Sequence, residues 1–525
     1  MSDDHNIPTA KHGLNPEPSE RLMRPFHRFS KLSSSGGIVL LLMTAIAMIW
    51  ANSQYADSYF EIFNETETRI TVAHNPKYAP ADDYAKPTEY PNENTHPIVD
   101  EKLPAHNGTA EDDHADDAHD SHGWTPLKEE PLWWQGHSTT AWINDLLMAI
   151  FFLVVGLEIK REILVGELAS PKRAALPIFG AIGGMVGPAL IFVFFNYGKE
   201  TIGGWGIPMA TDIAFAVGIL AMLGNRVPKS LLVFLTSLAI VDDLGALIVI
   251  AVFYTENLDI AYMGYAAMVI AVLMFMNVLR VRWITLYLVL GLPLWYFVYM
   301  SGVHATIAGV LLAMTIPAHA RVNATNFVFS TRKALDVFAN ASDDPDTDVT
   351  QSSERRAAVN AIMQNARQVL PPLHRIEHVL HPWAAFVIIP IFALANAGIP
   401  VTGGATENLS DPAAIGIILG LFVGKPLGII LCCYLGYKLG LATLPKGVSW
   451  RHILGAGTLA GIGFTMAIFI ANLAYANDAS HLQHAKLAIL VASTISAIAG
   501  ATILLTCKSK PEPEPESMGP LVDKD

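Results

Sequence analysis

Long apolar stretches recur along this chain from Gly36 to Leu505, separated by shorter polar connections. Each stretch holds about 20 residues, the number that a helix needs to cross the ~30 Å hydrocarbon core of a bilayer. The pattern therefore predicts an all-α integral membrane protein with about twelve transmembrane helices. The expected spans are residues 36–52, 141–163, 174–196, 203–223, 230–254, 260–279, 283–300, 302–318, 379–399, 413–436, 452–475 and 484–506.

The composition agrees with a membrane protein rather than with several soluble domains. Of the 525 residues, 52% are hydrophobic and 15% are charged, and soluble proteins usually carry more charge. The net charge of −13 comes mainly from one polar connection and from the C-terminal tail. It therefore marks no binding face, and nucleic acid is excluded as a partner. The three cysteines show neither a disulfide framework nor zinc-ligand spacing.

Lysine and arginine gather in alternate connections, and this asymmetry sets the expected orientation. The connections between them are poor in both residues. By the positive-inside rule, both termini are expected to be cytoplasmic. We expect a cytoplasmic N-terminal tail at 1–35, a transmembrane domain at 36–506 and a Pro/Glu-rich cytoplasmic tail at 507–525.

Two long polar inserts interrupt the transmembrane domain. Residues 55–134 form an acidic connection on the outer side that is too charged to bury a core. Three of its histidines, His114, His119 and His122, could bind a divalent metal loosely, although a solvated acidic loop is the preferred interpretation. On the inner side, residues 322–370 contain Ala-rich, helix-capable stretches around an Asp/Ser/Thr-rich middle.

The two halves of the chain show a weak internal sequence similarity. Val186-Gly-Pro-Ala-Leu in the third span is similar to Val423-Gly-Lys-Pro-Leu in the tenth, and parts of the fourth and eleventh spans are similar too. The third and tenth spans start on opposite sides of the membrane under the expected orientation. The repeats are therefore expected to be inverted, a common build of secondary transporters.

Three spans carry ionisable groups at mid-depth, where a charge is costly and is rarely kept without a function. These are Asp212 in the fourth span, Asp242 and Asp243 in the fifth and Lys425 in the tenth. An unsatisfied charge is prohibitive in hydrocarbon, so these side chains are expected to converge or to face water.

The fourth and eleventh spans are expected to unwind in their middles. Pro208 precedes Thr211 in the fourth span. Four glycines loosen the eleventh, at positions 455, 457, 461 and 463. Two discontinuous helices would point half-helix ends at the charged groups and free backbone carbonyls for an ion.

These residues favour a site shared by a hard cation and protons. Two carboxylates, the Thr211 hydroxyl and freed carbonyls are the oxygen ligands that sodium prefers, so Asp242 and Asp243 are the candidate Na⁺ ligands. Adjacent carboxylates resist simultaneous ionisation and can hold a proton instead, although a nearby Lys425 ammonium opposes this. The alternative is a purely structural role, in which a buried Asp242–Lys425 salt bridge only stabilises the bundle.

A second cluster of titratable residues is expected at the inner membrane edge. Its members close the second span and open the ninth, and they are Glu158, Arg161, Glu162, Glu377, His378 and His381. Histidine titrates between pH 5 and 8, so this cluster is a candidate pH sensor. An ordinary cytoplasmic charge cluster explains the same residues equally well.

One motif favours another class of protein. His374-Arg-Ile-Glu-His378 matches the H-x-x-E-H pattern of an intramembrane metalloprotease. It follows Pro371-Pro372 and is short enough to match by chance, so it ranks far below transport. Within transport, a sodium-coupled symporter for an organic solute is the second hypothesis.

Seven stretches, taken together, resemble the NhaA-type sodium/proton antiporters of bacterial inner membranes. In chain order they are Ala-Thr211-Asp212-Ile-Ala-Phe, Ala-Ile-Val-Asp242-Asp243-Leu-Gly-Ala, Ser-Gly-Val-His304-Ala-Thr, Glu377-His-Val-Leu-His381-Pro-Trp, Leu-Ala-Asn396-Ala-Gly, Gly-Lys425-Pro-Leu-Gly and Gly-Ile-Gly-Phe464-Thr-Met. The likeness runs from about Gly36 to Leu505 outside the two inserts.

The resemblance implies a twelve-helix, inverted-repeat membrane fold that exchanges cytoplasmic Na⁺ or Li⁺ for external H⁺ without a cofactor. It implies electrogenic exchange and a homodimer. Asp242 and Asp243 would be the ion and proton carboxylates, Lys425 their partner, and Thr211 and Asp212 would lie at the crossing of two broken helices. The inner cluster falls where the family senses pH. The two inserts depart from the family pattern and affect the expected dimer contact and the activation pH.

Overall fold

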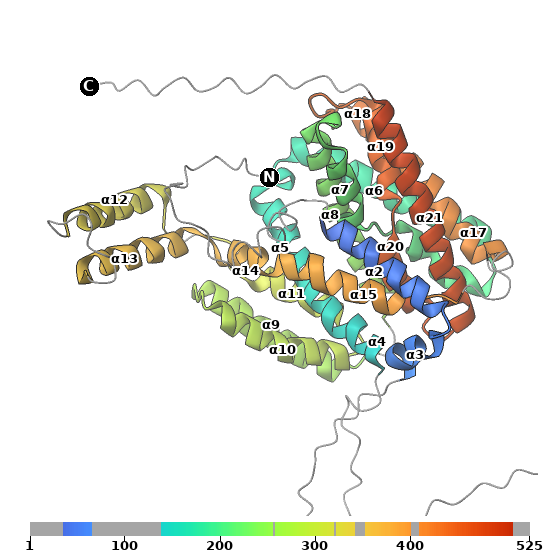
Figure 1. The fold of residues 1–525 in the computed structure, drawn as a ribbon, viewed down its shortest axis with the longest axis horizontal. Coiled ribbons are helices and arrows are strands. Elements are labelled where there is room, and N and C mark those ends of the chain that lie inside the picture. Colours follow the sequence, from blue (N-terminus) through green and yellow to red (C-terminus); the bar gives the residue numbers. More distant parts are fainter. Residues whose placement is uncertain are drawn as a thin grey trace, which may run out of the picture. The chain divides into compact units, whose positions relative to one another are not determined.

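The computed structural model describes residues 35–65, 138–255, 258–319, 322–341, 352–400 and 409–507. Over these ranges the regular elements are all helices, with no strand (Figure 1). Apolar helices long enough to cross a membrane recur throughout, and the protein is a multi-pass membrane protein.

The observed helices reproduce the predicted spans. Eight apolar helices are long enough to span a bilayer, one further span is a bent pair, and three apolar helices are shorter. The uninterrupted spans and the shorter apolar helices are α2 (Ser35–Ala51), α6 (Pro171–Asn196), α8 (Lys229–Phe253), α9 (Ile260–Val278), α10 (Ile284–Met300), α11 (Thr306–Thr315) and α21 (Ala479–Thr506).

Two spans are broken in their middles, as expected. The fourth consists of the 3₁₀-helix η5 (Glu200–Met209) and α7 (Ile213–Met222). The eleventh consists of α19 (Trp450–Ala460) and α20 (Phe464–Ala474), which meet at a 46° bend. Proline ends regular hydrogen bonding near the first break, and glycines offer little resistance to unwinding at the second.

Three other spans contain a π-helical turn that the apolar pattern does not predict. The second span runs through α4 (Thr139–Trp142), η3 (Ile143–Leu147) and α5 (Met148–Val165). The ninth runs through α14 (Pro372–Trp383), η7 (Ala384–Ile388) and α15 (Ile389–Asn396), and the tenth through α17 (Pro412–Leu419), η8 (Gly420–Gly424) and α18 (Lys425–Lys438). A π turn contains one extra residue, so it rotates the helix face that follows it. In the tenth span, Lys425 is the first residue after this turn.

The third and tenth spans, which are similar in sequence, also pack against each other. α6 and α18 approach so closely at Gly183 and Gly428 that a Cβ on either residue would lie 2.0 Å from the other's carbonyl oxygen. A helix pair can pack this closely only through small residues. The two broken spans meet each other as well, which fits the inverted-repeat fold of a secondary transporter.

The outer insert begins later than predicted. Helix α3 (Ala56–Phe60) and the turn η1 (Glu61–Glu65) follow α2 directly. Tyr59 is buried, and its hydroxyl donates to the Leu394 carbonyl oxygen. Burial raises the pKa of Tyr59 to about 12. Residues 56–65 therefore belong to the helical domain, because an aromatic side chain with a satisfied hydroxyl anchors them. His114, His119 and His122 lie outside the described residues.

The inner insert contains two helices, as its Ala-rich stretches predicted. They are α12 (Ala324–Asn340) and α13 (Ser353–Val369), and they pack side by side (Figure 1). Ser352 caps α13 by accepting a hydrogen bond from the Arg355 backbone. Short 3₁₀ turns, η4 (Glu167–Ala169) and η6 (Gly224–Arg226), complete the described elements.

Candidate functional site

The unwound segments of the two broken spans touch each other. The backbone N–H of Asp212 donates to the Ile462 carbonyl oxygen at 2.7 Å. The Thr211 hydroxyl oxygen lies 3.0 Å from the Ala460 carbonyl oxygen. Four half-helix ends therefore meet at one place, two N-termini and two C-termini, each with backbone groups that lack partners within their own helix.

Asp212 accepts hydrogen bonds from the N-termini of both α7 and α20 at this crossing. One carboxylate oxygen accepts from the Phe215 backbone N–H at the start of α7. The other accepts from the backbone N–H and the hydroxyl of Thr465 at the start of α20, at 3.2 and 2.5 Å. A carboxylate is the charge that helix N-termini favour, so Asp212 compensates two positive helix ends at once.

Thr465 was not singled out from the sequence. Its position in the first turn after a glycine-loosened stretch is the signal that could have identified it, since Thr hydroxyls there commonly meet backbone or carboxylate groups. Its side chain is buried, and it links the second half of the eleventh span to the fourth.

Lys425 provides the opposite charge at the C-terminal end of η5. Its ammonium group donates to the Met209 carbonyl oxygen. It also lies 2.7 Å from Asp242 Oδ2, and both side chains are fully buried. The expected Asp242–Lys425 contact is therefore present. The negative end of the helix dipole and the paired carboxylate both stabilise the ammonium group.

The two adjacent aspartates of α8 have different surroundings. Asp242 Oδ2 accepts from Lys425 and from the Thr211 hydroxyl, both at 2.7 Å. Asp243 is buried too, and its Oδ2, like Oδ1 of Asp242, has no hydrogen-bond partner among the described residues. A buried, unpartnered carboxylate oxygen is costly unless a proton or a cation joins it. Asp242 is thus the member that pairs with Lys425, and each carboxylate keeps one oxygen that can accept a ligand.

The groups in this region that could coordinate a cation are oxygen atoms. Within the described ranges, no three His, Cys, Asp or Glu side chains are grouped to hold a metal ion. A cation beside Asp243 would therefore draw on hydroxyl and carbonyl oxygens as well as carboxylates. That mixture suits a hard, singly charged ion.

The inner cluster forms between α5 and α14, with one exception. Arg161 contacts Glu377 and lies 3.1 Å from Glu162. His381 Nε2 lies 3.8 Å from Glu158 Oε1. His378 is exposed and makes no ion pair with any described residue, whereas Glu377 is buried.

The H-x-x-E-H stretch adopts no ligand arrangement. His374 Nδ1 lies 3.7 Å from Glu377 Oε2, and Glu377 is occupied by Arg161. His378, the second histidine of the motif, is exposed. A zinc site needs three or more ligands directed at one point, and among the described residues no three His, Cys, Asp or Glu side chains are grouped in this way.

An asparagine network joins the second, ninth and eleventh spans. Asn396, which ends α15, donates to Asn144 Oδ1 at 2.9 Å and accepts from Asn472 Nδ2 at 2.8 Å. Asn144 belongs to η3 and Asn472 to α20. Amide side chains that satisfy one another hold helices in register without introducing a charge.

A family model described as Na⁺/H⁺ antiporter 1 matches residues 27–83 and 119–504. The match covers most of the chain, and the gap between residues 83 and 119 lies inside the acidic outer connection.

Curated relatives agree with this match over nearly the whole chain. The Na(+)/H(+) antiporter NhaA of Oleidesulfovibrio alaskensis is 44% identical over 512 residues, which is 97% of this chain and 99% of the relative. The protein of that name from Wolinella succinogenes is 47% identical over 380 residues, 72% of this chain and 83% of the relative. One from Escherichia coli O1:K1 is 40% identical over 480 residues, 91% of this chain and 97% of the relative. On this similarity, and with two broken helices crossing beside a buried carboxylate pair, the chain belongs to the Na⁺/H⁺ antiporter 1 family.

Proposed function

We propose that the protein is a secondary transporter that exchanges cytoplasmic Na⁺ or Li⁺ for external H⁺. The observation that carries this proposal is the buried carboxylate pair beside Lys425, in which Asp243 Oδ2 has no hydrogen-bond partner among the residues that the structure describes. Family membership supports the same activity. Sodium-induced proton movement in proteoliposomes without an organic solute tests it and separates it from sodium-coupled symport.

In this proposal Na⁺ and H⁺ compete for Asp243 and Asp242. A proton neutralises Asp243 directly. A sodium ion supplies a charge to the same oxygen and takes further oxygen ligands, including Thr211 and carbonyls freed at the crossing. Because one occupant must leave before the other binds, exchange requires no further coupling element, and no cofactor is part of the proposal.

Asp212 and Lys425 hold the crossing together while the site changes occupancy. Their charges compensate the helix ends at the positions where the backbone is unwound. Two carboxylates beside one ammonium can bind more protons than sodium ions, so electrogenic exchange with protons in excess is part of the proposal.

We assign the orientation from the lysine and arginine asymmetry, with both termini cytoplasmic in a bacterial inner membrane. In a variant with Cys432, Cys433 and Cys507 replaced by Ser, single cysteines at Asp120, Lys333 and Lys510 test it. A membrane-impermeant thiol reagent added to intact cells should label Asp120→Cys alone, since Lys333 and Lys510 lie in Lys/Arg-rich connections. The opposite labelling would reverse the orientation of every span.

The inner cluster is proposed to set the pH at which exchange begins. Glu377→Gln removes the carboxylate that Arg161 contacts. The electrostatic potential at the remaining titratable groups of the cluster therefore becomes more positive. We expect the pH profile of exchange to move by about one pH unit while the maximal rate changes little. Sodium-dependent fluorescence dequenching in everted vesicles across a pH series measures both quantities.

Glu167→Gln is the matched control for Glu377→Gln. Glu167 also pairs with an arginine, Arg173 at 3.3 Å, but both side chains are far more exposed. Salt bridges at such positions contribute little. Equal profiles for the two variants would identify the inner cluster as an ordinary surface charge group.

We also propose that the protein works as a homodimer in the lipid bilayer. The family resemblance supports this, and the lipid-exposed apolar helices suit a bilayer environment. Chemical cross-linking in native membranes tests the dimer.

A further inference from the structure

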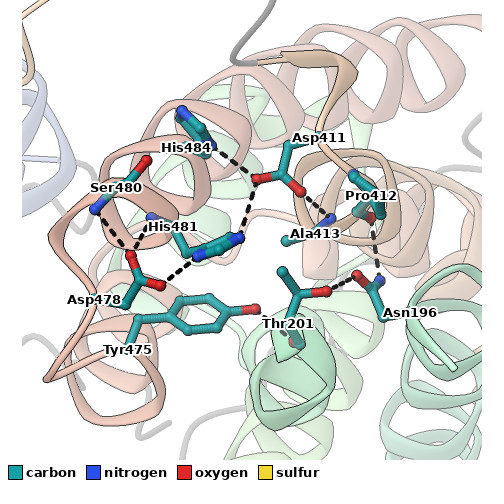
Figure 2. A network of polar contacts seen from close by, with 10 residues as sticks. All are labelled: Asn196, Thr201, Asp411, Pro412, Ala413, Tyr475, Asp478, Ser480, His481 and His484. Carbon is teal, nitrogen blue, oxygen red and sulfur yellow. Dashed lines mark hydrogen bonds and ion pairs between the residues drawn. The ribbon is translucent and has the colours of Figure 1, made fainter. Parts of the chain in front are cut away.

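A polar cluster outside the proposed ion site joins the predicted outer ends of several spans (Figure 2). Its titratable members are Asp411 before α17, Tyr475 and Asp478 after α20, and His481 and His484 in the first turns of α21. Under the proposed orientation these ends face the outer medium. Sequence reasoning did not identify this cluster, because its residues lie in two connections far apart in the chain.

Two imidazoles meet two carboxylates in this cluster. His484 Nδ1 lies 2.8 Å from Asp411 Oδ2, and the other oxygen of Asp411 caps α17 through the Ala413 N–H. His481 Nδ1 lies 2.5 Å from Asp478 Oδ2, and its Nε2 lies 3.9 Å from Asp411 Oδ2. His481 therefore stands between the carboxylates, and Figure 2 shows its ring directed at both.

Charge makes this arrangement sensitive to protons. A neutral imidazole has one N–H, which His481 can donate to Asp478, but it carries no charge. Only protonated His481 is a cation, so only then does it form an ion pair with Asp411 across 3.9 Å while it donates to Asp478. Charge-assisted bonds of this kind are stronger than neutral ones. Proton binding thus tightens the contact between α21 and the start of α17.

The same cluster continues to the outer ends of the third and fourth spans. The Tyr475 hydroxyl donates to the Thr201 carbonyl oxygen at 2.8 Å. The Thr201 hydroxyl donates to Asn196 Oδ1 at 2.6 Å, and Asn196 Nδ2 donates to the Pro412 carbonyl oxygen at 3.1 Å. The Tyr475 ring lies beside His481, with centroids 6.0 Å apart. The outer ends of five spans are therefore joined through side chains.

Three of the joined elements lead directly to the proposed ion site. η5 (Glu200–Met209) contains Thr201 and ends at the Lys425 contact. α20 (Phe464–Ala474) ends just before Tyr475 and begins beside Thr465, and the tenth span begins just after Asp411 and contains Lys425. α20 has 11 residues, so its two ends are only about 16 Å apart. A change in how these outer ends are held is therefore transmitted to the crossing through rigid half-helices.

We propose that His481, supported by His484 and Asp411, binds a proton from the outer medium and latches the outer ends of these spans together. The latched form opposes the separation that sodium release to the outside requires, so external acid slows exchange and external alkali relieves it. This regulation rests on the proposed antiport, of which it is an additional control.

The other titratable groups that face the imidazoles are Asp478, Tyr475 and Asp411. Hydrogen bonds from the His481 backbone and side chain hold the pKa of Asp478 below its usual value, so Asp478 stays ionised. Burial raises the pKa of Tyr475, which stays neutral. Asp411 faces both rings, and the rings lie with their centroids 6.3 Å apart. Histidine is the side chain whose ordinary charge change falls between pH 5 and 8.

Paired substitutions test the latch in opposite directions. His481→Gln cannot become charged, and His481→Arg is charged at every pH. In proteoliposomes with a single orientation and a fixed internal pH, ²²Na⁺/Na⁺ exchange is measured at external pH 5.5 to 8.5. Relative to the parent protein, His481→Gln should exchange equally at pH 8.5 and about tenfold faster at pH 5.5, a coupling typical of one regulatory site. His481→Arg should match the parent at pH 5.5 and fall about tenfold below it at pH 8.5.

His319→Gln is the matched control, because this exposed histidine lies near the opposite ends of the spans. It should follow the parent at every external pH. A rate ratio of His481→Gln to parent that stays constant with external pH, while both proteins exchange Na⁺ for H⁺, overturns the latch and leaves the proposed function intact.

Hydrogen–deuterium exchange gives a readout that does not depend on transport. After correction for intrinsic pH dependence, backbone amides at residues 200–204 and 475–484 should exchange faster at pH 8 than at pH 6 in the parent protein. His481→Gln should remove that difference, and His481→Arg should keep these amides protected at both values. An unchanged difference in His481→Gln would overturn the latch even if the protein proved not to be an antiporter.

Discussion

Asp243→Asn is expected to abolish sodium-driven proton movement while the protein still inserts in the membrane. Asparagine keeps the size of the side chain and one acceptor oxygen, but it can neither bind and release a proton nor offer a charge to sodium. Both half-reactions should therefore fail together. Because the Oδ2 atom of Asp243 has no partner to lose, the substitution should leave the fold intact. In everted vesicles, sodium-driven dissipation of the pH gradient should fall by roughly 100-fold or more across the whole pH range, as for a group that binds both substrates.

Asp259→Asn is the control for this experiment. It makes the same chemical change at an exposed residue that caps α9 through the Ala261 N–H, and asparagine caps helices nearly as well as aspartate. Its exchange should equal that of the parent protein. Near-normal exchange by correctly inserted Asp243→Asn would falsify the central role of this carboxylate.

The second large effect is expected on stability, at the Asp242–Lys425 ion pair. Lys425→Ala leaves the buried Asp242 charge uncompensated and removes the donor to the Met209 carbonyl oxygen. Breaking a buried pair from one side typically costs about 3–5 kcal/mol. We expect Lys425→Ala to unfold at a much lower temperature in detergent. Some exchange should survive if the lysine mainly stabilises the bundle.

A double-mutant cycle separates stability from transport at this pair. Asp242→Asn should also be destabilising, because it leaves the Lys425 ammonium unpaired. The double variant Asp242→Asn/Lys425→Met buries no charge at either position, so it should recover much of the lost unfolding temperature and still transport poorly. Thermal unfolding of the four proteins checks this, and purely additive losses would show that the two side chains are not energetically coupled.

Much of this molecule follows from local patterns in the chain. Apolar length is a local property, and it predicted the spans and their all-α fold because a lipid-embedded backbone must satisfy its hydrogen bonds within each helix. Pro208 and the glycines of the eleventh span likewise act on their own backbone, so both breaks were predictable. Asp212, Asp242, Asp243 and Lys425 were identifiable as a group because isolated charges cannot be buried without a reason.

The roles of the individual charged residues depend on contacts between distant segments. Asp242 and Asp243 are neighbours in sequence, yet only the packing of the bundle and the unwound fourth span brings Lys425 and Thr211 to Asp242 rather than to Asp243. Thr465 reaches Asp212 across the crossing.

The membrane-crossing segments, the breaks in two of them and the side chains that are too costly to bury without a function are all predictable from local features of the chain. Contacts between helices determine which carboxylate pairs with Lys425, and packing sets how π-helical turns orient the ninth and tenth spans. Packing also determines that Asp411 and His481 meet across two connections. The reason is physical: hydrophobicity and backbone propensity act over a few neighbouring residues, whereas hydrogen bonds and ion pairs between helices depend on the rotation and register of each helix, which only the packed bundle specifies.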